Sequence, residues 1–146
     1  MGGRRKESLQ QMDIRERSEE RNERRLRVLV IDDDENARDA MSRLATRQGT
    51  VVMAAATGLQ GVAKAQVERP DVILLDLMMP GVGGHEVLAR LGADAATATI
   101  PVIVVTSHFI NDEERRQILT RASAVIYRQD LSRETVTSAI DSALGR

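Results

Sequence analysis

The sequence predicts a three-layer α/β fold in which a parallel sheet of five strands is covered by helices on both faces. Short runs of aliphatic residues alternate five times with segments whose apolar residues recur at helical spacing. Each run is almost continuously apolar, as in a strand that is buried on both sides. Parallel neighbours require crossover connections, and right-handed crossovers place the connecting helices against the sheet.

The elements follow one another in a regular order. Strands are expected at residues 26–31, 50–54, 71–75, 100–105 and 124–127. Helices are expected at residues 35–48, 57–67, 85–91, 111–121 and 132–145. Thr57, Asn111 or Asp112, and Ser132 are suitable N-caps because their side-chain oxygens can accept backbone N–H groups. In the second helix a common stripe is expected, made of Leu59, Val62, Ala63 and Gln66.

Composition excludes several classes of protein. The 146 residues carry a net charge of −1 and no cysteine, which removes disulfides and thiolate metal sites. Near-neutral charge gives no electrostatic reason to expect nucleic-acid or membrane binding. No apolar run approaches the roughly 20 residues of a membrane span, and the N-terminus lacks the apolar core of a signal peptide. We expect a cytoplasmic protein with an aliphatic core, since Phe109 and Tyr127 are its only aromatic residues.

Residues 1–25 differ in composition from residues 26–146, which form the predicted domain. They are rich in charge and poor in apolar residues. We interpret them as a solvated arm, helical or disordered. The alternative is a helix that docks on a partner or on a second copy.

Polar residues follow four of the five predicted strands. The first strand is followed by Asp32 and Asp33, and the third, fourth and fifth by Asp76, Thr106 and Arg128. The second strand is followed only by alanines, so it fits an outer position, which gives the order 2-1-3-4-5. Because the carboxyl ends of parallel strands share one edge, we expect these five side chains to meet there.

Such a cluster is suited to phosphoryl transfer. Three carboxylates raise one another's pKa unless a cation lies among them, and oxygen ligands without His or Cys favour Mg²⁺. A carboxylate oxygen of Asp76 can attack phosphorus and form an acyl phosphate. The hydroxyl of Thr106 and the guanidinium of Arg128 can bind phosphoryl oxygens.

The segments VLVIDDDE, ILLDLMMPGVGG, IPVIVVTS and AVIYR together resemble the receiver domain of bacterial response regulators, from about Leu26 to Leu144. The resemblance implies a flavodoxin-like fold. The ending of the fifth strand and the following LSRE most resemble receivers attached to sensor histidine kinases.

The resemblance also implies roles for individual residues. Asp76 corresponds to the phosphoacceptor, Asp33 to the direct Mg²⁺ ligand and Asp32 to its partner. Met78 would offer its backbone carbonyl to the metal, and Thr106 would be the hydroxyl that moves toward the phosphoryl group.

Three positions depart from the family pattern. Arg128 stands in place of the usual lysine, and a planar guanidinium is not equivalent to an ammonium group. Val125 replaces the switch aromatic, so aromatic coupling to Thr106 is absent, and Tyr127 is not assumed to replace it. Gln129 replaces a proline, so no cis bond is expected there. We expect slower phosphorylation of Asp76 or altered switching.

The predicted function is that of a phosphorelay receiver rather than a turnover enzyme. A sensor histidine kinase or phosphotransfer protein would donate the phosphoryl group, which would shift a two-state equilibrium of the face formed by the fourth strand, fourth helix and fifth strand. Because the sequence ends near the last helix, we expect output through protein–protein contact, and a homodimer is compatible with this. The alternative is an interaction module that does not cycle phosphate. An aspartate-nucleophile phosphatase is disfavoured, because that class needs an acid where Met78 stands.

Overall fold

The computed structural model describes residues 25–47 and 49–146, and nearly all of the predicted arm lies outside them. Five parallel strands form one sheet in the order β2-β1-β3-β4-β5, as predicted. The strands are β1 (Arg27–Ile31), β2 (Val51–Ala55), β3 (Val72–Asp76), β4 (Val102–Thr106) and β5 (Ala124–Tyr127). The helices are α2 (Glu35–Ala45), α3 (Gly58–Glu68), α4 (Gly84–Ala93), α5 (Asp112–Leu119) and α6 (Arg133–Ala143). A short 3₁₀ turn, η1 (Arg128–Asp130), follows β5.

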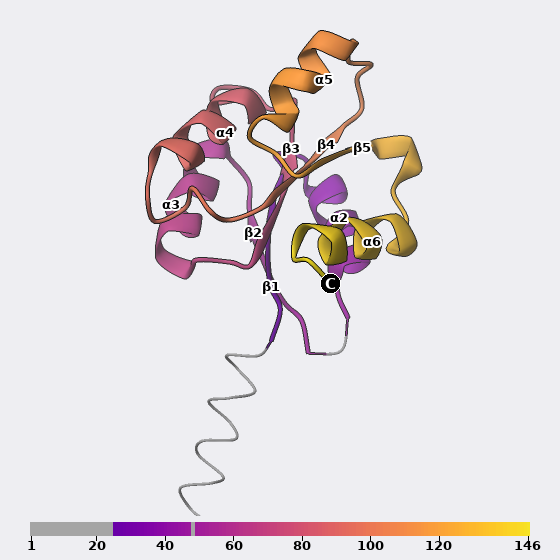
Figure 1. The fold of residues 1–146 in the computed structure, drawn as a ribbon. Helices are drawn as coiled ribbons and strands as arrows, with labels where there is room; N and C mark the ends of the chain where they lie inside the picture. The colour runs from indigo at the N-terminus through magenta and orange to yellow at the C-terminus, as the bar shows by residue number, and fades with distance from the viewer. Residues whose placement is uncertain (1–24, 48) are drawn as a thin grey trace, which may run out of the picture.

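The sheet lies between two helical layers, with α3, α4 and α5 on one face and α2 and α6 on the other (Figure 1). Alternate residues of each strand point to opposite layers. In β1, Leu29 and Ile31 pack toward the layer of α3, α4 and α5, whereas Val28 and Val30 pack toward α2 and α6. Two aliphatic cores therefore form, and both depend on a sheet that is buried on both faces.

Side-chain caps fix where most helices begin. The side chains of Asp34, Thr57, Asn111 and Ser132 each accept a backbone N–H in the first turn of α2, α3, α5 and α6, respectively. Several other boundaries differ by one to three residues from expectation. The helix α2 ends at Ala45, and β4 begins at Val102 because Pro101 has no N–H to donate to the sheet.

The strand β3 begins and ends one residue later than expected, and this difference matters for the site. Its last residue is Asp76, which pairs with Val105 of β4 instead of following the strand. The backbone of the acid is therefore held within the sheet, and its position relative to the neighbouring strands is fixed.

The stripe predicted on α3 was correct only for Val62, which is buried, whereas Leu59 (53% exposed), Ala63 and Gln66 face solvent. The buried residues of the helix are Gly58, Gly61, Val62 and Ala65. The glycines explain the difference, because a Cβ at Gly61 would collide with the Ile31 side chain. The face of α3 that carries the glycines therefore packs closely against β1, and Leu59 is left exposed.

Within the described part of the chain, no helix is long and apolar enough to cross a membrane.

Two glycines of α4 provide a matched test of this packing. A Cβ at Gly84 would lie 2.7 Å from Leu77 Cα and 3.0 Å from the carbonyl oxygen of Asp76, whereas a Cβ at Gly92 would meet nothing within 4 Å. We expect Gly84→Ala to lower the free energy of unfolding by about 1–3 kcal/mol. Gly92→Ala should raise it by about 0.5–1 kcal/mol through helix propensity. Urea denaturation measures both, and equal effects would contradict the packing described.

Candidate functional site

The carboxyl edge of the sheet gathers the polar residues predicted to meet there. Asp32 directly follows β1, Asp76 and Thr106 are the last residues of β3 and β4, and Arg128 directly follows β5. Asp32, Asp76 and Thr106 are buried. The remaining strand, β2, lies at the outer edge and ends in Ala55, so it contributes no charged group.

Three carboxylates form the centre of the site. Asp32, Asp33 and Asp76 each offer an oxygen, and these oxygens lie within 4.8 Å of one another. Asp32 is held by its surroundings, since its Oδ1 accepts the backbone N–H of Asp34 at 2.9 Å. Asp33 is exposed, so the cluster opens to solvent on its side.

Burial makes the Asp76 carboxylate costly to ionise. Burial foremost, and next the neighbouring charge of Asp32, raise the pKa of Asp76 from 3.8 to about 7. The backbone N–H of Met78, 3.2 Å from Asp76 Oδ1, and the charge of Arg128 act in the opposite direction. The positive charge supplied by the described residues therefore compensates this acid only in part.

Arg128 reaches into the cluster from η1. A single guanidinium nitrogen, Nη2, lies 3.2 Å from Asp32 Oδ2 and 3.4 Å from Asp76 Oδ1. Its side chain is 32% exposed, while both carboxylates are almost completely buried. The arginine thus bridges the two buried acids from the solvent side.

The hydroxyl of Thr106 is engaged with its own loop. Thr106 Oγ1 accepts the backbone N–H of His108 at 3.1 Å and lies 3.4 Å from the carbonyl oxygen of His108, to which it can donate. This local pairing satisfies a buried hydroxyl. Binding of a phosphoryl oxygen by Thr106 would require the hydroxyl to leave this loop.

The remaining predicted positions surround the cluster. Met78 contributes its N–H to Asp76, and its side chain is 49% exposed. Val125 and Tyr127 are half-buried on the same face of β5, against the core under α3, α4 and α5. No cis peptide bond occurs among the described residues, which agrees with the presence of Gln129 after Arg128.

One contact of the site was missed by the sequence analysis. The Nη1 of Arg38 donates to the backbone carbonyl of Asp32 at 2.9 Å. The only signal for it was an arginine on the second turn of the helix that begins beside the three acids. Arg38 therefore bonds the backbone of the cluster, and none of the hydrogen bonds of the described residues joins it to the carboxylates.

The chemistry of these groups fits a divalent cation of the Mg²⁺ type. The candidate ligands are hard carboxylate oxygens from three side chains, two of them buried, and the described histidines do not belong to the group. A cation among them would favour the ionised form of Asp76. Asp32, Asp33 and Asp76 are therefore the residues that would hold it.

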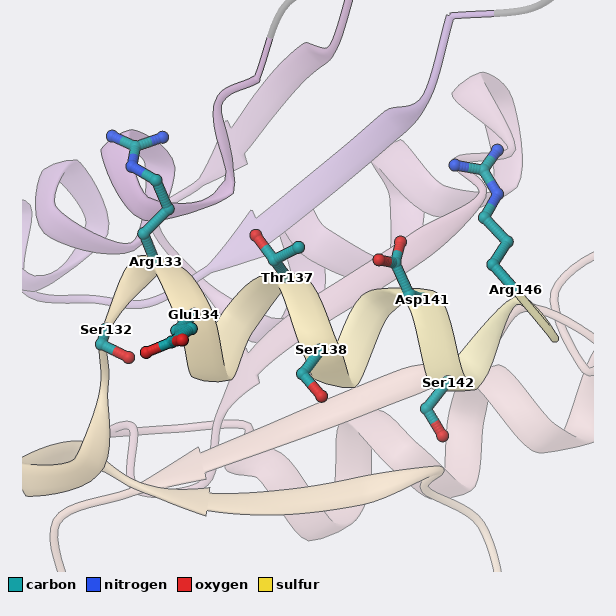
Figure 2. Close-up of a pocket in the computed structure, with 8 residues that line it drawn as sticks. All are labelled: Ser132, Arg133, Glu134, Thr137, Ser138, Asp141, Ser142 and Arg146. Carbon is teal, nitrogen blue, oxygen red and sulfur yellow. The ribbon is translucent and has the colours of Figure 1, made fainter.

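Two hollows on the surface differ in their relation to the cluster. One, of about 570 Å³, adjoins it and is lined by Thr106, Ser107, Phe109, Tyr127, Arg128 and Gln129. The other runs along α6 and is lined by polar side chains of that helix and its end (Figure 2). In the latter, Asp141 pairs with Arg47 of the α2 side at 3.1 Å, so it contributes to helix packing.

The fold and site together define a receiver domain. The model of the response regulator receiver domain family matches residues 28–140, and the chain belongs to this family of two-component signalling.

Individual relatives agree with the family match. The chain is 40% identical over 81 residues to Protein PilH of Pseudomonas aeruginosa, a match that covers 56% of this chain and 67% of PilH. It is 35% identical over 118 residues to a gliding motility regulatory protein of Myxococcus xanthus, which covers 81% of this chain but 15% of that protein. The similarity thus concerns a domain that other proteins combine with further segments.

Solved structures show the same fold. Chemotaxis protein CheY4 of Vibrio cholerae superposes with a TM-score of 0.74 at 25% identity, covering 82% of this chain and 99% of that one. The receiver domain of a histidine kinase from Syntrophus aciditrophicus gives a TM-score of 0.71 at 21% identity, with 82% and 89% covered. At that identity the second likeness concerns the fold alone.

The raised pKa of Asp76 predicts how stability depends on pH. Between about pH 4 and pH 7 the folded protein binds more protons than the unfolded chain, so the free energy of unfolding should fall as pH rises through this window. Asp76→Asn should remove most of this loss, which we expect to be roughly 2–4 kcal/mol. Asp39→Asn, at an exposed position of α2, is the control and should leave the pH profile unchanged. Urea denaturation at several pH values measures this, and a wild-type profile that rises across the window would contradict the burial argument.

Proposed function

We propose that the chain is a phosphoacceptor of a two-component phosphorelay, phosphorylated on Asp76 with the help of Mg²⁺. The observation that carries the proposal is the position of Asp76, buried at the end of β3 beside two further carboxylates and an arginine. Its family membership supports the same function.

In this reaction a carboxylate oxygen of Asp76 attacks the phosphorus of a phosphohistidine. The bond between that oxygen and phosphorus forms, and the bond between phosphorus and the imidazole nitrogen breaks. The electron pair stays on that nitrogen, and the imidazole leaves as a neutral ring because its other nitrogen carries a proton. The donor is a sensor histidine kinase or a histidine phosphotransfer protein. When held by Asp32, Asp33, Asp76 and the Met78 carbonyl, Mg²⁺ would neutralise negative charge on the transferring group.

Two further residues act on the phosphoryl group. Arg128 already lies beside Asp76 and is suited to bind phosphoryl oxygens through its N–H donors. Thr106 would exchange its contacts to His108 for a phosphoryl oxygen, which couples the modification to the loop between β4 and α5. The face formed by β4, α5 and β5 would then shift between two states.

The output is proposed to be contact with another protein in the cytoplasm, without direct binding of nucleic acid or membrane. A homodimer is one form that such contact can take. The chain accepts and loses its own phosphoryl group and does not turn over an external substrate. Val125, in place of an aromatic residue, means that switching here relies on the backbone of the loop rather than on rotation of an aromatic ring.

A second candidate is an interaction module that keeps the fold without cycling phosphate. The observation that favours it is the pairing of Arg128 with Asp32 and Asp76, which partly satisfies the acids without any other cation. In that case the residues of the pocket would serve stability alone.

The two candidates differ in a simple experiment. Incubated with a small phosphodonor and Mg²⁺, the wild-type chain should gain the mass of one phosphoryl group, measured by mass spectrometry of the intact protein. Asp76→Asn should abolish the gain, and Asp33→Asn should reduce it strongly because a metal ligand is lost. A chain that stays unmodified under these conditions would support the interaction module.

The contact of Arg128 with Asp76 predicts that replacing this arginine changes the rate at which Asp76 is phosphorylated. Arg128→Lys should accelerate phosphorylation of Asp76 severalfold, because a flexible ammonium group leaves the two carboxylates more easily than a planar guanidinium. The time course of mass gain measures the rate. Rates that are equal in both proteins would show that the arginine does not limit the reaction.

A further inference from the structure

Arg128 occupies the place of a cation between two of the three carboxylates. We propose that it exchanges with the metal: it binds Asp32 and Asp76 in the metal-free protein and moves into the adjoining hollow, beside Phe109 and Tyr127, when a divalent cation binds. This inference rests on the metal site of the proposed function and adds a residue that controls access to it.

The first step of the argument is competition for the same oxygens. Nη2 of Arg128 contacts one oxygen of Asp32 and one of Asp76, and these residues supply two of the three candidate ligands. A guanidinium remains charged at any pH that the protein withstands. Mg²⁺ requires ligands at about 2.0–2.1 Å in near-octahedral geometry, which leaves no room for a guanidinium between those carboxylates. Metal binding therefore displaces Arg128.

The second step concerns where the arginine goes. Its side chain is 32% exposed and already forms part of the wall of the hollow of about 570 Å³. The guanidinium can therefore move without unfolding of any strand. The same hollow is lined by Phe109 and Tyr127, the only two aromatic residues of the chain.

The aromatic residues suit this role chemically. Phe109 is 87% exposed, so the face of its ring is open to a cation. A guanidinium stacks on aromatic faces and is attracted to them by the cation–π interaction. The hollow thus offers the displaced arginine a favourable position.

The exchange also prepares the phosphoryl site. The same hollow is lined by Thr106 and Ser107. An arginine released from the carboxylates would lie next to the threonine hydroxyl, with its donors free for phosphoryl oxygens. Cation binding would thereby convert Arg128 from a partner of the acids into a ligand of the incoming group.

A titration with Mg²⁺ tests the exchange through two readouts. Calorimetry measures affinity, and tyrosine fluorescence reports on Tyr127, because the chain has one tyrosine and no tryptophan. In the wild type, the emission should change and saturate together with the binding heat. Arg128→Ala should bind Mg²⁺ about tenfold more tightly, since no internal cation is displaced, and should lose the emission change.

A second variant keeps the test valid if Arg128→Ala is poorly folded. Phe109→Ala removes an exposed ring and should weaken Mg²⁺ binding by about two- to fivefold, because the displaced arginine loses its receiving surface. Arg38→Ala also removes a charge near the cluster, but from a backbone carbonyl, so it should tighten binding less than Arg128→Ala. Arg90→Ala breaks an exposed pair with Glu86 and should change nothing.

The outcomes separate this inference from the proposed function. The exchange is overturned if neither Arg128→Ala nor Phe109→Ala changes the affinity for Mg²⁺. It is also overturned if the emission change persists in Arg128→Ala. Either result leaves the proposed metal site intact. If neither the wild type nor the variants bind Mg²⁺, both the exchange and the proposed metal site are wrong.

Discussion

The contact between Asp32 and Asp76 is the constraint on which the site depends. Both acids are buried where β1 and β3 end side by side, so neither can turn to water to relieve the repulsion. Charge repulsion in a partly buried site has to be offset by protonation, by a side-chain cation or by a metal. The raised pKa of Asp76 and the bridging position of Arg128 are two of these responses in the same molecule. The proposed Mg²⁺ site is the third.

Much of this arrangement could be predicted from the sequence. Aliphatic runs fix the strands, and the absence of polar residues after β2 correctly places that strand at the edge, which brings β1 and β3 together. The position of the acids then follows from the parallel direction of the strands. The face of β5 shared by Val125 and Tyr127 follows from strand periodicity.

Other features depend on tertiary contacts that periodicity does not encode. The α3 stripe was misassigned because Gly58 and Gly61 bury a face that has little side-chain hydrophobicity, which leaves Leu59 in solvent. The Arg38 contact depends on how α2 sits against the end of β1. The Thr106 hydroxyl turns to His108 because a local donor is available in its own loop. Packing between a helix and the sheet decides the first two cases, whereas the Thr106 contact is made within two residues and is decided by the local conformation of the loop.

A structure with Mg²⁺ and beryllofluoride, a mimic of the phosphoryl group, tests the central claim most directly. The account predicts the beryllofluoride on one carboxylate oxygen of Asp76, the metal held among Asp32, Asp33 and Asp76, and Arg128 and Thr106 turned toward the fluorine atoms. A structure in which Arg128 still bridges Asp32 and Asp76, with neither metal nor beryllofluoride bound under saturating conditions, would contradict it.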